Sequence, residues 1–254
     1  MLKKRIIPTL LLKDGRMVKG RNFSAYRDVG NPVTAARVYN AQKADELVFL
    51  DIRPTRQSKQ SVYRIIEEAA SECFMPLTVG GGINSCEDIK EFLDIGADKV
   101  AINSAAVRNP ELIREGAALF GDQCIVVSVD YRIGPDGNRR LCIDSGRTVL
   151  DMDPLEHIRK CVELGAGEIL LTSISHEGMM LGYDWEFIEK VSGMIEVPLI
   201  ANGGAGKLED FQRIFTATNA SAAAAGSIFH FTDQSPIKTR FFLFNHGVDV
   251  RMPG

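Results

Sequence analysis

The stretch Pro76–Ser85, PLTVGGGINS, decides the fold of this chain. Its aliphatic and β-branched run ends in three glycines, and the amphipathic segment 85–95 follows at once. This order predicts a buried strand, a tight turn and a helix, which together make one β/α unit. The same order returns in PLIANGG (198–204), ahead of a second amphipathic segment at 207–216.

One constant offset relates the two copies of this unit. Identical residues stand 122 positions apart in the pairs Pro76 and Pro198, Gly81 and Gly203, Gly82 and Gly204, Glu87 and Glu209, Asp88 and Asp210, and Glu46 and Glu168. The regularity predicts a single domain over residues 1–254, built from two half-barrels at roughly 1–122 and 123–254. Two separate domains are disfavoured, because no linker rich in Pro, Ser or Gly lies near residue 122.

Further apolar runs have the same character as these two strands. They lie at 6–12, 46–52, 99–103, 124–130, 168–174 and 220–226. Apolar runs without polar alternation are typical of parallel strands that are buried on both faces. Eight such strands separated by amphipathic segments predict an α/β fold, a closed (β/α)8 TIM barrel, at its usual size of about 250 residues.

The composition excludes several classes of partner. Charged residues make up 25% of the chain and the net charge is −3, which does not favour a nucleic-acid or membrane partner. Five cysteines without a C-x-x-C pair, and only four histidines, make a poor disulfide framework or metal site. No run approaches the roughly 20 apolar residues of a membrane span. We therefore expect a cytoplasmic protein with no metal and no cofactor.

Glycines and small polar residues gather at the ends of four predicted strands. They are Gly80–Gly82, Asn103–Ser104, Gly203–Gly204 and Gly226–Ser227. Chemistry in such barrels lies at this end of the strands, and glycines there let backbone N–H groups approach an anion. The simpler interpretation is that tight turns need glycine. Because the turns occupy equal positions in both halves, we expect a small-molecule substrate with a phosphate at each end.

A single acid stands where a pair could be expected. Aligning RIIPTLLLK (5–13) with CIVVSVDYR (124–132) places Asp130 opposite Leu11. Two facing acids could divide the roles of general acid and general base. This chain has one, unless Asp130 is only a structural, capped or ion-paired acid. The segment Tyr131–Thr148 is expected to form a hairpin over the same end of the barrel.

Four charges mark the opposite ends of the strands. Arg5, Glu46, Lys99 and Glu168 each begin a predicted strand. Charges among buried strand starts are costly unless they are paired. Two cations and two anions could close a ring across the base of the barrel, although strand starts that are merely exposed to solvent would also be polar.

Several of these motifs resemble one family along essentially the whole chain. They are KRIIPTLLLKDGRMVKG (4–20), DELVFLDI (45–52), TVGGGI (78–83), GADKVAIN (96–103), GAGEILLTSI (165–174), GGAGK (203–207) and SIFHF (227–231). Together they look like the cyclase (synthase) subunit of imidazole glycerol phosphate synthase. The resemblance implies a lyase-type subunit in a heterodimer with a class I glutaminase, which sends ammonia through the barrel. In histidine biosynthesis that enzyme forms imidazole glycerol phosphate and a purine precursor.

The resemblance also implies roles for individual residues. Those of the substrate and phosphate site are Lys19, Asp51, Gly82, Asn103, Ser104, Glu177, Gly178, Gly204, Gly226 and Ser227. Lys19 corresponds to a lysine on a mobile first loop, and Asp130 to the general acid/base. Arg5, Glu46, Lys99 and Glu168 correspond to the ammonia gate, and Asp98 to an acid at the glutaminase contact.

Departures from the family pattern cluster at the substrate end. Leu11 stands where the family has a catalytic aspartate, Ser175 and Glu177 replace aspartates, and Asn202 replaces a serine. Loss of a general acid or base costs typically ~10²–10⁴-fold in rate. We therefore expect a diverged synthase subunit, associated with ammonia supply for amidation in surface-sugar biosynthesis, as in O-antigen or lipopolysaccharide pathways.

Other functions stay open. The chain could be an ordinary cyclase of histidine biosynthesis, with Asp14 or Glu177 replacing the missing acid. It could be a non-catalytic protein that only activates a glutaminase. A related sugar-isomerase barrel uses the same two acids, so Leu11 counts against this function. Such an isomerase also has no need of the gate charges.

Overall fold

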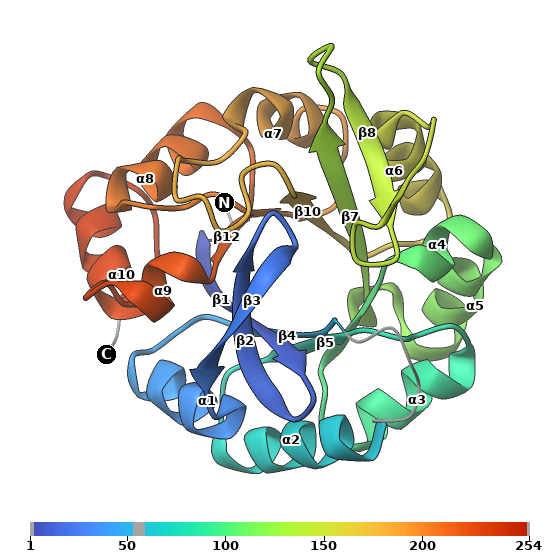
Figure 1. The fold of residues 1–254 in the computed structure, drawn as a ribbon, viewed down its shortest axis with the longest axis horizontal. Helices are drawn as coiled ribbons and strands as arrows, with labels where there is room; N and C mark the ends of the chain where they lie inside the picture. The colour runs from blue at the N-terminus through green and yellow to red at the C-terminus, as the bar shows by residue number, and fades with distance from the viewer. Residues whose placement is uncertain (1–2, 53–58, 253–254) are drawn as a thin grey trace.

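The computed structural model describes residues 3–52 and 59–252, in which parallel strands close into a barrel (Figure 1). In chain order the barrel strands are β1 (Arg5–Lys13), β4 (Leu47–Asp51), β5 (Leu77–Gly80), β6 (Lys99–Ile102), β7 (Ile125–Ile133), β10 (Glu168–Ser173), β11 (Leu199–Asn202) and β12 (Ala222–Ala225). Strand β1 pairs with β4 on one side and with β12 on the other, which closes the ring. The predicted (β/α)8 barrel is confirmed; its division into two half-barrels stays a prediction.

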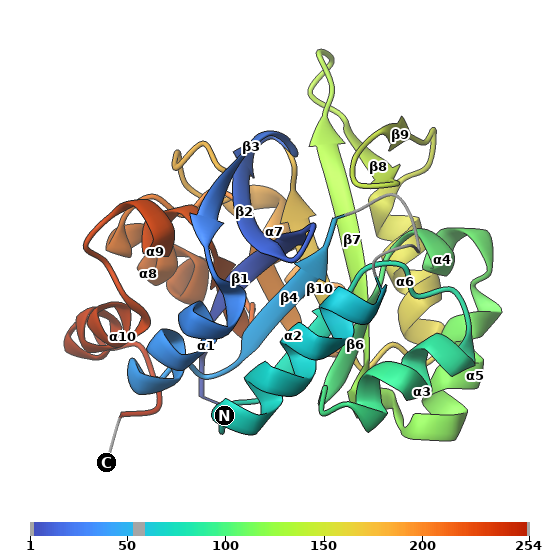
Figure 2. The ribbon, with the colours of Figure 1, turned by 60° about the horizontal axis from the view of Figure 1, so that its bottom comes forward.

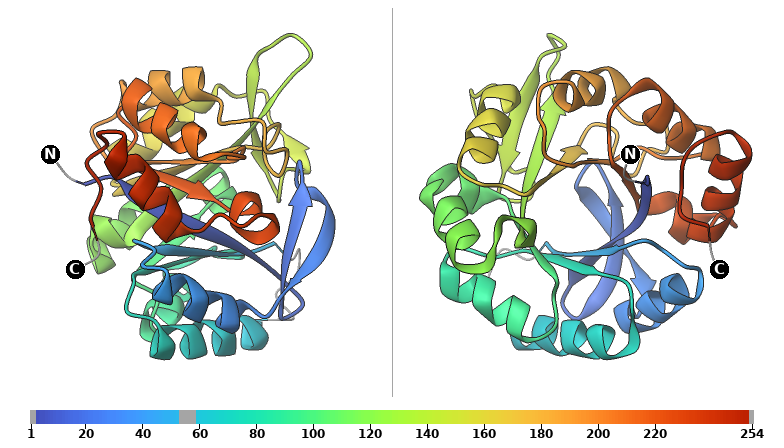
Figure 3. Two further views of the ribbon diagram at one scale, coloured as in Figure 1. Left: turned by 90° about the vertical axis from the view of Figure 1, so that its left-hand side faces the viewer. Right: turned by 180° about the vertical axis from the view of Figure 1, so that it is seen from behind.

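Helices surround this barrel on the outside (Figures 1 and 3). They are α1 (Pro32–Ala41), α2 (Lys59–Glu72), α3 (Cys86–Asp94), α4 (Ser104–Arg108), α5 (Glu111–Phe120), η2 (Asp122–Cys124), α6 (Pro154–Glu163), α7 (Trp185–Ser192), α8 (Leu208–Ala217), α9 (Ser227–Phe231) and α10 (Pro236–Asn245). None of the helices in the described ranges is long and apolar enough to cross a membrane.

The opening stretch of sequence folds as its pattern predicts. Strand β5 ends at Gly80, and Ser85 caps α3 by accepting a hydrogen bond from the backbone N–H of Asp88. A side chain on Gly81 would collide with the backbone of Asp51 on the neighbouring strand. The glycine therefore lets two strand ends lie against each other, next to the start of a helix.

Strand periodicity places different chemistry at successive heights inside the barrel. Side chains of a strand alternate between its two faces, so every second residue points inward. On β1 this inward column runs from Arg5 through Ile7 and Thr9 to Leu11, from the base of the barrel to its mouth. One strand thus contributes a charge to the base, an aliphatic side chain to the middle and a pocket residue to the mouth.

Two strands run on beyond the barrel into hairpins that rise from the same end (Figure 2). The first consists of the end of β1 with β2 (Arg16–Arg21) and β3 (Ser24–Gly30). The second consists of the end of β7 with β8 (Arg139–Ile143) and β9 (Thr148–Val149). Asp14 and Gly15 form the first turn, both with positive φ, while the second turn spans 134–138. The hairpin expected over Tyr131–Thr148 is confirmed.

Candidate functional site

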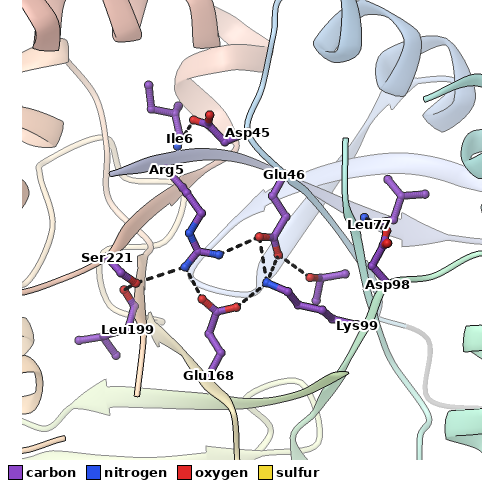
Figure 4. Close-up of polar contacts among 11 residues, drawn as sticks. Arg5, Ile6, Asp45, Glu46, Leu77, Asp98, Lys99, Glu168, Leu199 and Ser221 are labelled. Atoms are coloured by element: carbon purple, nitrogen blue, oxygen red, sulfur yellow. Dashed lines mark hydrogen bonds and ion pairs between the residues drawn. The ribbon is translucent and has the colours of Figure 1, made fainter. Parts of the chain in front are cut away.

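A closed ring of charges lies across the base of the barrel (Figure 4). Arg5 Nη1 lies 2.8 Å from Glu46 Oε2, and Arg5 Nη2 contacts Glu168 Oε1. Lys99 Nζ lies 3.1 Å from Glu46 Oε2 and 2.8 Å from Glu168 Oε2. Each cation therefore contacts both anions, as the strand starts predicted.

The ring is held in place by its neighbours. The Thr78 hydroxyl donates to Glu46 Oε1 at 2.6 Å, and Arg5 also donates to the Ser221 hydroxyl at 3.2 Å. Glu46 is 2% exposed and Glu168 4%, so these are not simply solvated strand starts. Burial opposes the charge on Arg5, but Glu168 and Glu46 outweigh it and raise the Arg5 pKa. Mutual neutralisation is what keeps four charges stable at this depth.

Asp98 lies beside the base of the barrel and is exposed. Its carboxylate accepts a hydrogen bond from the backbone N–H of Leu77 at 2.8 Å, at the first residue of β5. The Asp45 carboxylate likewise accepts a hydrogen bond from the backbone N–H of Ile6 on β1, also at 2.8 Å. Asp98 thus helps to hold the start of β5 in place. Its role at a partner contact stays a prediction.

Apolar side chains fill the barrel above the ring. They are Ile7, Val48, Ala101, Val126, Leu170, Ile200, Ala222 and Ala224, each at most 3% exposed. Several of these side chains are single methyl groups. The layer between the charge ring and the pocket at the mouth is therefore packed hydrocarbon.

A pocket of about 250 Å³ opens at the mouth of the barrel. Its lining includes Leu11 from β1, Asp51 from the end of β4, and Asp130 from β7. Strands β1 and β7 stand on opposite sides of the barrel, since three strands separate them in the sheet order. Leu11 thus occupies the side of the pocket that faces Asp130.

Asp130 is a buried carboxylate with polar but uncharged neighbours. It is 8% exposed, and the Asn103 amide lies 3.2 Å from Asp130 Oδ2. Burial raises the pKa of Asp130 to about 7, against a smaller lowering by the hydroxyl of Thr172. A carboxyl group that titrates near neutral pH is suited to both accept and donate a proton.

The expected phosphate residues of the first half lie together in this pocket. Gly82, Asn103 and Ser104 all line it. The Ser104 hydroxyl also accepts a hydrogen bond from the backbone N–H of Asp144, 2.9 Å away, which joins this edge to the second hairpin. Arg108 contacts Asp144 at 2.7 Å. A cation therefore stands at the rim on this side.

Two of the expected residues of the second half, Gly178 and Gly226, lie against the first hairpin. A side chain on Gly178 would collide with the carbonyl of Gly20, and one on Gly226 would meet the methylenes of Lys19 at 3.0 Å. Ser227 is buried next to Gly226. A side chain on Gly204 would collide with the carbonyl of Gly182, so Gly204 permits another close backbone approach.

Lys19, expected on a mobile first loop, is buried at the mouth of the barrel, and the mobility of that segment stays a prediction. Lys19 lies on β2, whose pairing with β3 shifts register after Lys19, is 3% exposed and forms an ion pair with Glu177. Burial lowers its pKa to about 7. The reason is that β2 pairs with β1 on one edge and β3 on the other, which carries Lys19 back into the mouth of the barrel.

Some lining residues escaped the sequence analysis. Phe23 and Tyr26 enter the pocket from the first hairpin, and Arg108 and Arg147 stand at its rim. Their only signal in the sequence is their position in segments that follow strands one, four and five.

Comparison with known proteins places this geometry in a family. A profile described as histidine biosynthesis protein matches residues 5–235. The chain belongs to the histidine biosynthesis protein family. A protein named imidazole glycerol phosphate synthase subunit HisF from Bacillus cereus (strain G9842) is 46% identical over 252 residues, covering 99% of this chain and all of that protein.

Two further relatives in this family carry the same name. The one from Streptococcus mutans is 45% identical over 251 residues, covering 99% of this chain and all of the relative. The one from Staphylococcus carnosus is 45% identical over 252 residues, covering 99% of each chain. The resemblance to the synthase subunit is confirmed, and with it the expectation of a lyase-type enzyme subunit.

Proposed function

We propose that this chain is the synthase subunit of a glutamine amidotransferase of the imidazole glycerol phosphate synthase type. It receives ammonia from a class I glutaminase at the base and uses it in the pocket at the mouth. The observation that carries the proposal is the layering of a single barrel. A charge ring, an aliphatic middle and a pocket with an acid of pKa near 7 follow one another along the barrel.

Each layer suits one step of that reaction. The ring must separate briefly to admit a small molecule. Lys99 is suited to move, because it carries its charge on a flexible stem and contacts the two glutamates. Entry into the aliphatic middle costs neutral ammonia far less free energy than the ammonium ion, so this layer favours passage of the neutral form. Asp130 can then transfer protons on a substrate held between the glycine turns.

The names of the relatives favour the histidine pathway for the finer function. Proteins called imidazole glycerol phosphate synthase subunit HisF match the whole chain at 45–46% identity, which supports the cyclase over the surface-sugar function. In this version Asp130 alone handles the protons that two acids would share. The chain then forms imidazole glycerol phosphate and the purine precursor in the cytoplasm.

One observation favours a second candidate. Leu11 is 6% exposed and presents hydrocarbon to the pocket at the position where the resemblance implies an aspartate. In this version the chain passes ammonia on for amidation in surface-sugar biosynthesis and no longer carries out the cyclisation efficiently. The partner glutaminase, docked near Asp98, is common to both candidates.

Growth rescue separates the two candidates. A strain that lacks the cyclase subunit of histidine biosynthesis receives this chain, its Leu11→Asp variant or its Asp130→Asn variant, each together with a matching glutaminase. Full rescue by the unmodified chain, lost in Asp130→Asn, establishes the histidine-pathway cyclase. Rescue by Leu11→Asp alone excludes the histidine-pathway function for the unmodified chain and supports the second candidate. If the unmodified chain does not assemble with a glutaminase, the proposal as a whole is wrong.

A further inference from the structure

A buried ion pair joins two segments across the mouth of the barrel. Lys19 comes from β2 and Glu177 from the loop that follows β10. Their side chains are 3% and 10% exposed. A pair this deep is stable only while both charges stay compensated, because removal of one partner leaves an unpaired buried charge.

The surroundings of this pair contain more hydrogen-bonding capacity than the pair uses. The hydroxyls of Ser227 and Thr9 are buried and have no hydrogen-bond partner within the described chain. The stem of Lys19 lies against Gly226, whose backbone is next to Ser227 and close to the carbonyl of Thr9. Buried hydroxyls are normally paired, so unused ones point to a further oxygen-rich group.

Glu177 reaches toward one of the glycine turns as well. A side chain on Gly203 would come within 3.5 Å of Glu177 Oε2. The carboxylate is therefore set between the cation Lys19 and the turn that follows β11. A cation and a glycine turn on either side of this carboxylate, with unused hydroxyls near the stem of the cation, are the parts of an anion site.

We propose that Glu177 determines the specificity of this end of the pocket, because its carboxylate holds the place that one substrate phosphate takes. Binding is then an exchange of anions on Lys19. The inference rests on the proposed function, since it takes a phosphorylated substrate as given.

Exchange favours phosphate over other anions for a physical reason. A phosphate brings up to two charges and three strong acceptor oxygens, so it can satisfy Lys19 and the unused hydroxyls together. A ligand carboxylate offers one charge and two oxygens, which only equals what Glu177 already supplies. Glu177 therefore excludes weaker anions without blocking the site to phosphate.

The first hairpin can remain in place during this exchange. The side-chain amide of Asn22 donates to the carbonyls of Ile174 and Ser175, both at 2.9 Å. The Asn22 N–H donates to the carbonyl of Glu177 at 2.8 Å. These contacts hold the backbone around Glu177, so its side chain can leave Lys19 while the hairpin stays closed.

Titration with inorganic phosphate and with acetate tests this inference. Amide NMR signals of Gly226 and Ser227 report binding at this end of the pocket. They are recorded for the unmodified chain, for Glu177→Gln and for the control variant Glu189→Gln. Glu189 is an exposed acid on α7. We expect Glu177→Gln to bind phosphate at least 10-fold more tightly and to bind acetate, which the other two chains do not.

Unchanged or weaker phosphate affinity in Glu177→Gln would overturn the inference. So would the absence of phosphate shifts at Gly226 in every chain. Should Glu177→Gln fail to fold, Glu177→Asp replaces it. The shorter side chain forms a weaker ion pair with Lys19, so phosphate affinity should rise, but by less than the 10-fold expected for Glu177→Gln. If Glu177→Gln shows the expected gain in phosphate affinity but neither the unmodified chain nor Leu11→Asp rescues growth, the proposed function is contradicted and the assignment of Glu177 stands.

Discussion

At the base of the barrel two cations and two anions contact one another in a closed ring, whereas at the mouth Asp130 faces the hydrocarbon of Leu11. Both places are buried, so the difference lies in the partners. Opposite charges stabilise the ionised form of the ring. Asp130 has an amide and a hydroxyl beside it, and burial moves its pKa to about 7. The same barrel therefore pairs its charges with one another at one end and holds a carboxyl group that titrates near neutral pH at the other.

The largest expected effect concerns the titrating end. In a chain that carries Leu11→Asp, the further change Asp130→Asn should lower ammonia-dependent turnover by about 10²–10⁴-fold, because an amide cannot transfer the proton. Steady-state rates at saturating ammonium measure this. Unchanged circular dichroism and phosphate affinity serve as controls for folding and binding. A loss of less than about 10-fold would show that Asp130 is structural.

At the fixed end, Glu46→Gln should destabilise the fold by about 3–5 kcal/mol, since Arg5 and Lys99 then share one anion. Urea denaturation monitors the loss. The control is Lys90→Ala, which breaks an exposed pair with Asp94 on α3 and should cost no more than about 0.5 kcal/mol. Equal effects from the two changes would mean that the ring contributes no more than a surface ion pair.

A smaller effect follows from the pKa of Asp130. The folded chain binds a proton here up to about pH 7, while the unfolded chain releases it near the ordinary value of 3.8. Stability attributable to this group therefore falls as pH rises from about 4 to 7. Asp130→Asn should stabilise the fold by roughly 2–4 kcal/mol at pH 8 and by close to nothing at pH 4. Thermal unfolding at both pH values decides; a pH-independent difference would contradict the raised pKa.

The contrast between the two ends also shows what the sequence could predict. The ring was predictable because charges are rare at buried strand starts, and Asp130 because a carboxylate interrupts an apolar run. The ion pair of Lys19 with Glu177 was not, because it depends on how a hairpin folds over a loop more than 150 residues later in the chain. Phe23 and Tyr26 were missed for the same reason: nothing local in 16–30 shows that these side chains face the pocket.

We propose that the charge ring is the entrance for ammonia and that Asp130 is the acid/base at the mouth, with Leu11 in the place of a second acid. The most direct test of this claim is the rate of imidazole glycerol phosphate formation at saturating ammonium, measured side by side for the unmodified chain and for Leu11→Asp. We predict a rise of about 10²-fold or more in the variant. An unmodified chain that is already as fast as its variant would contradict the claim.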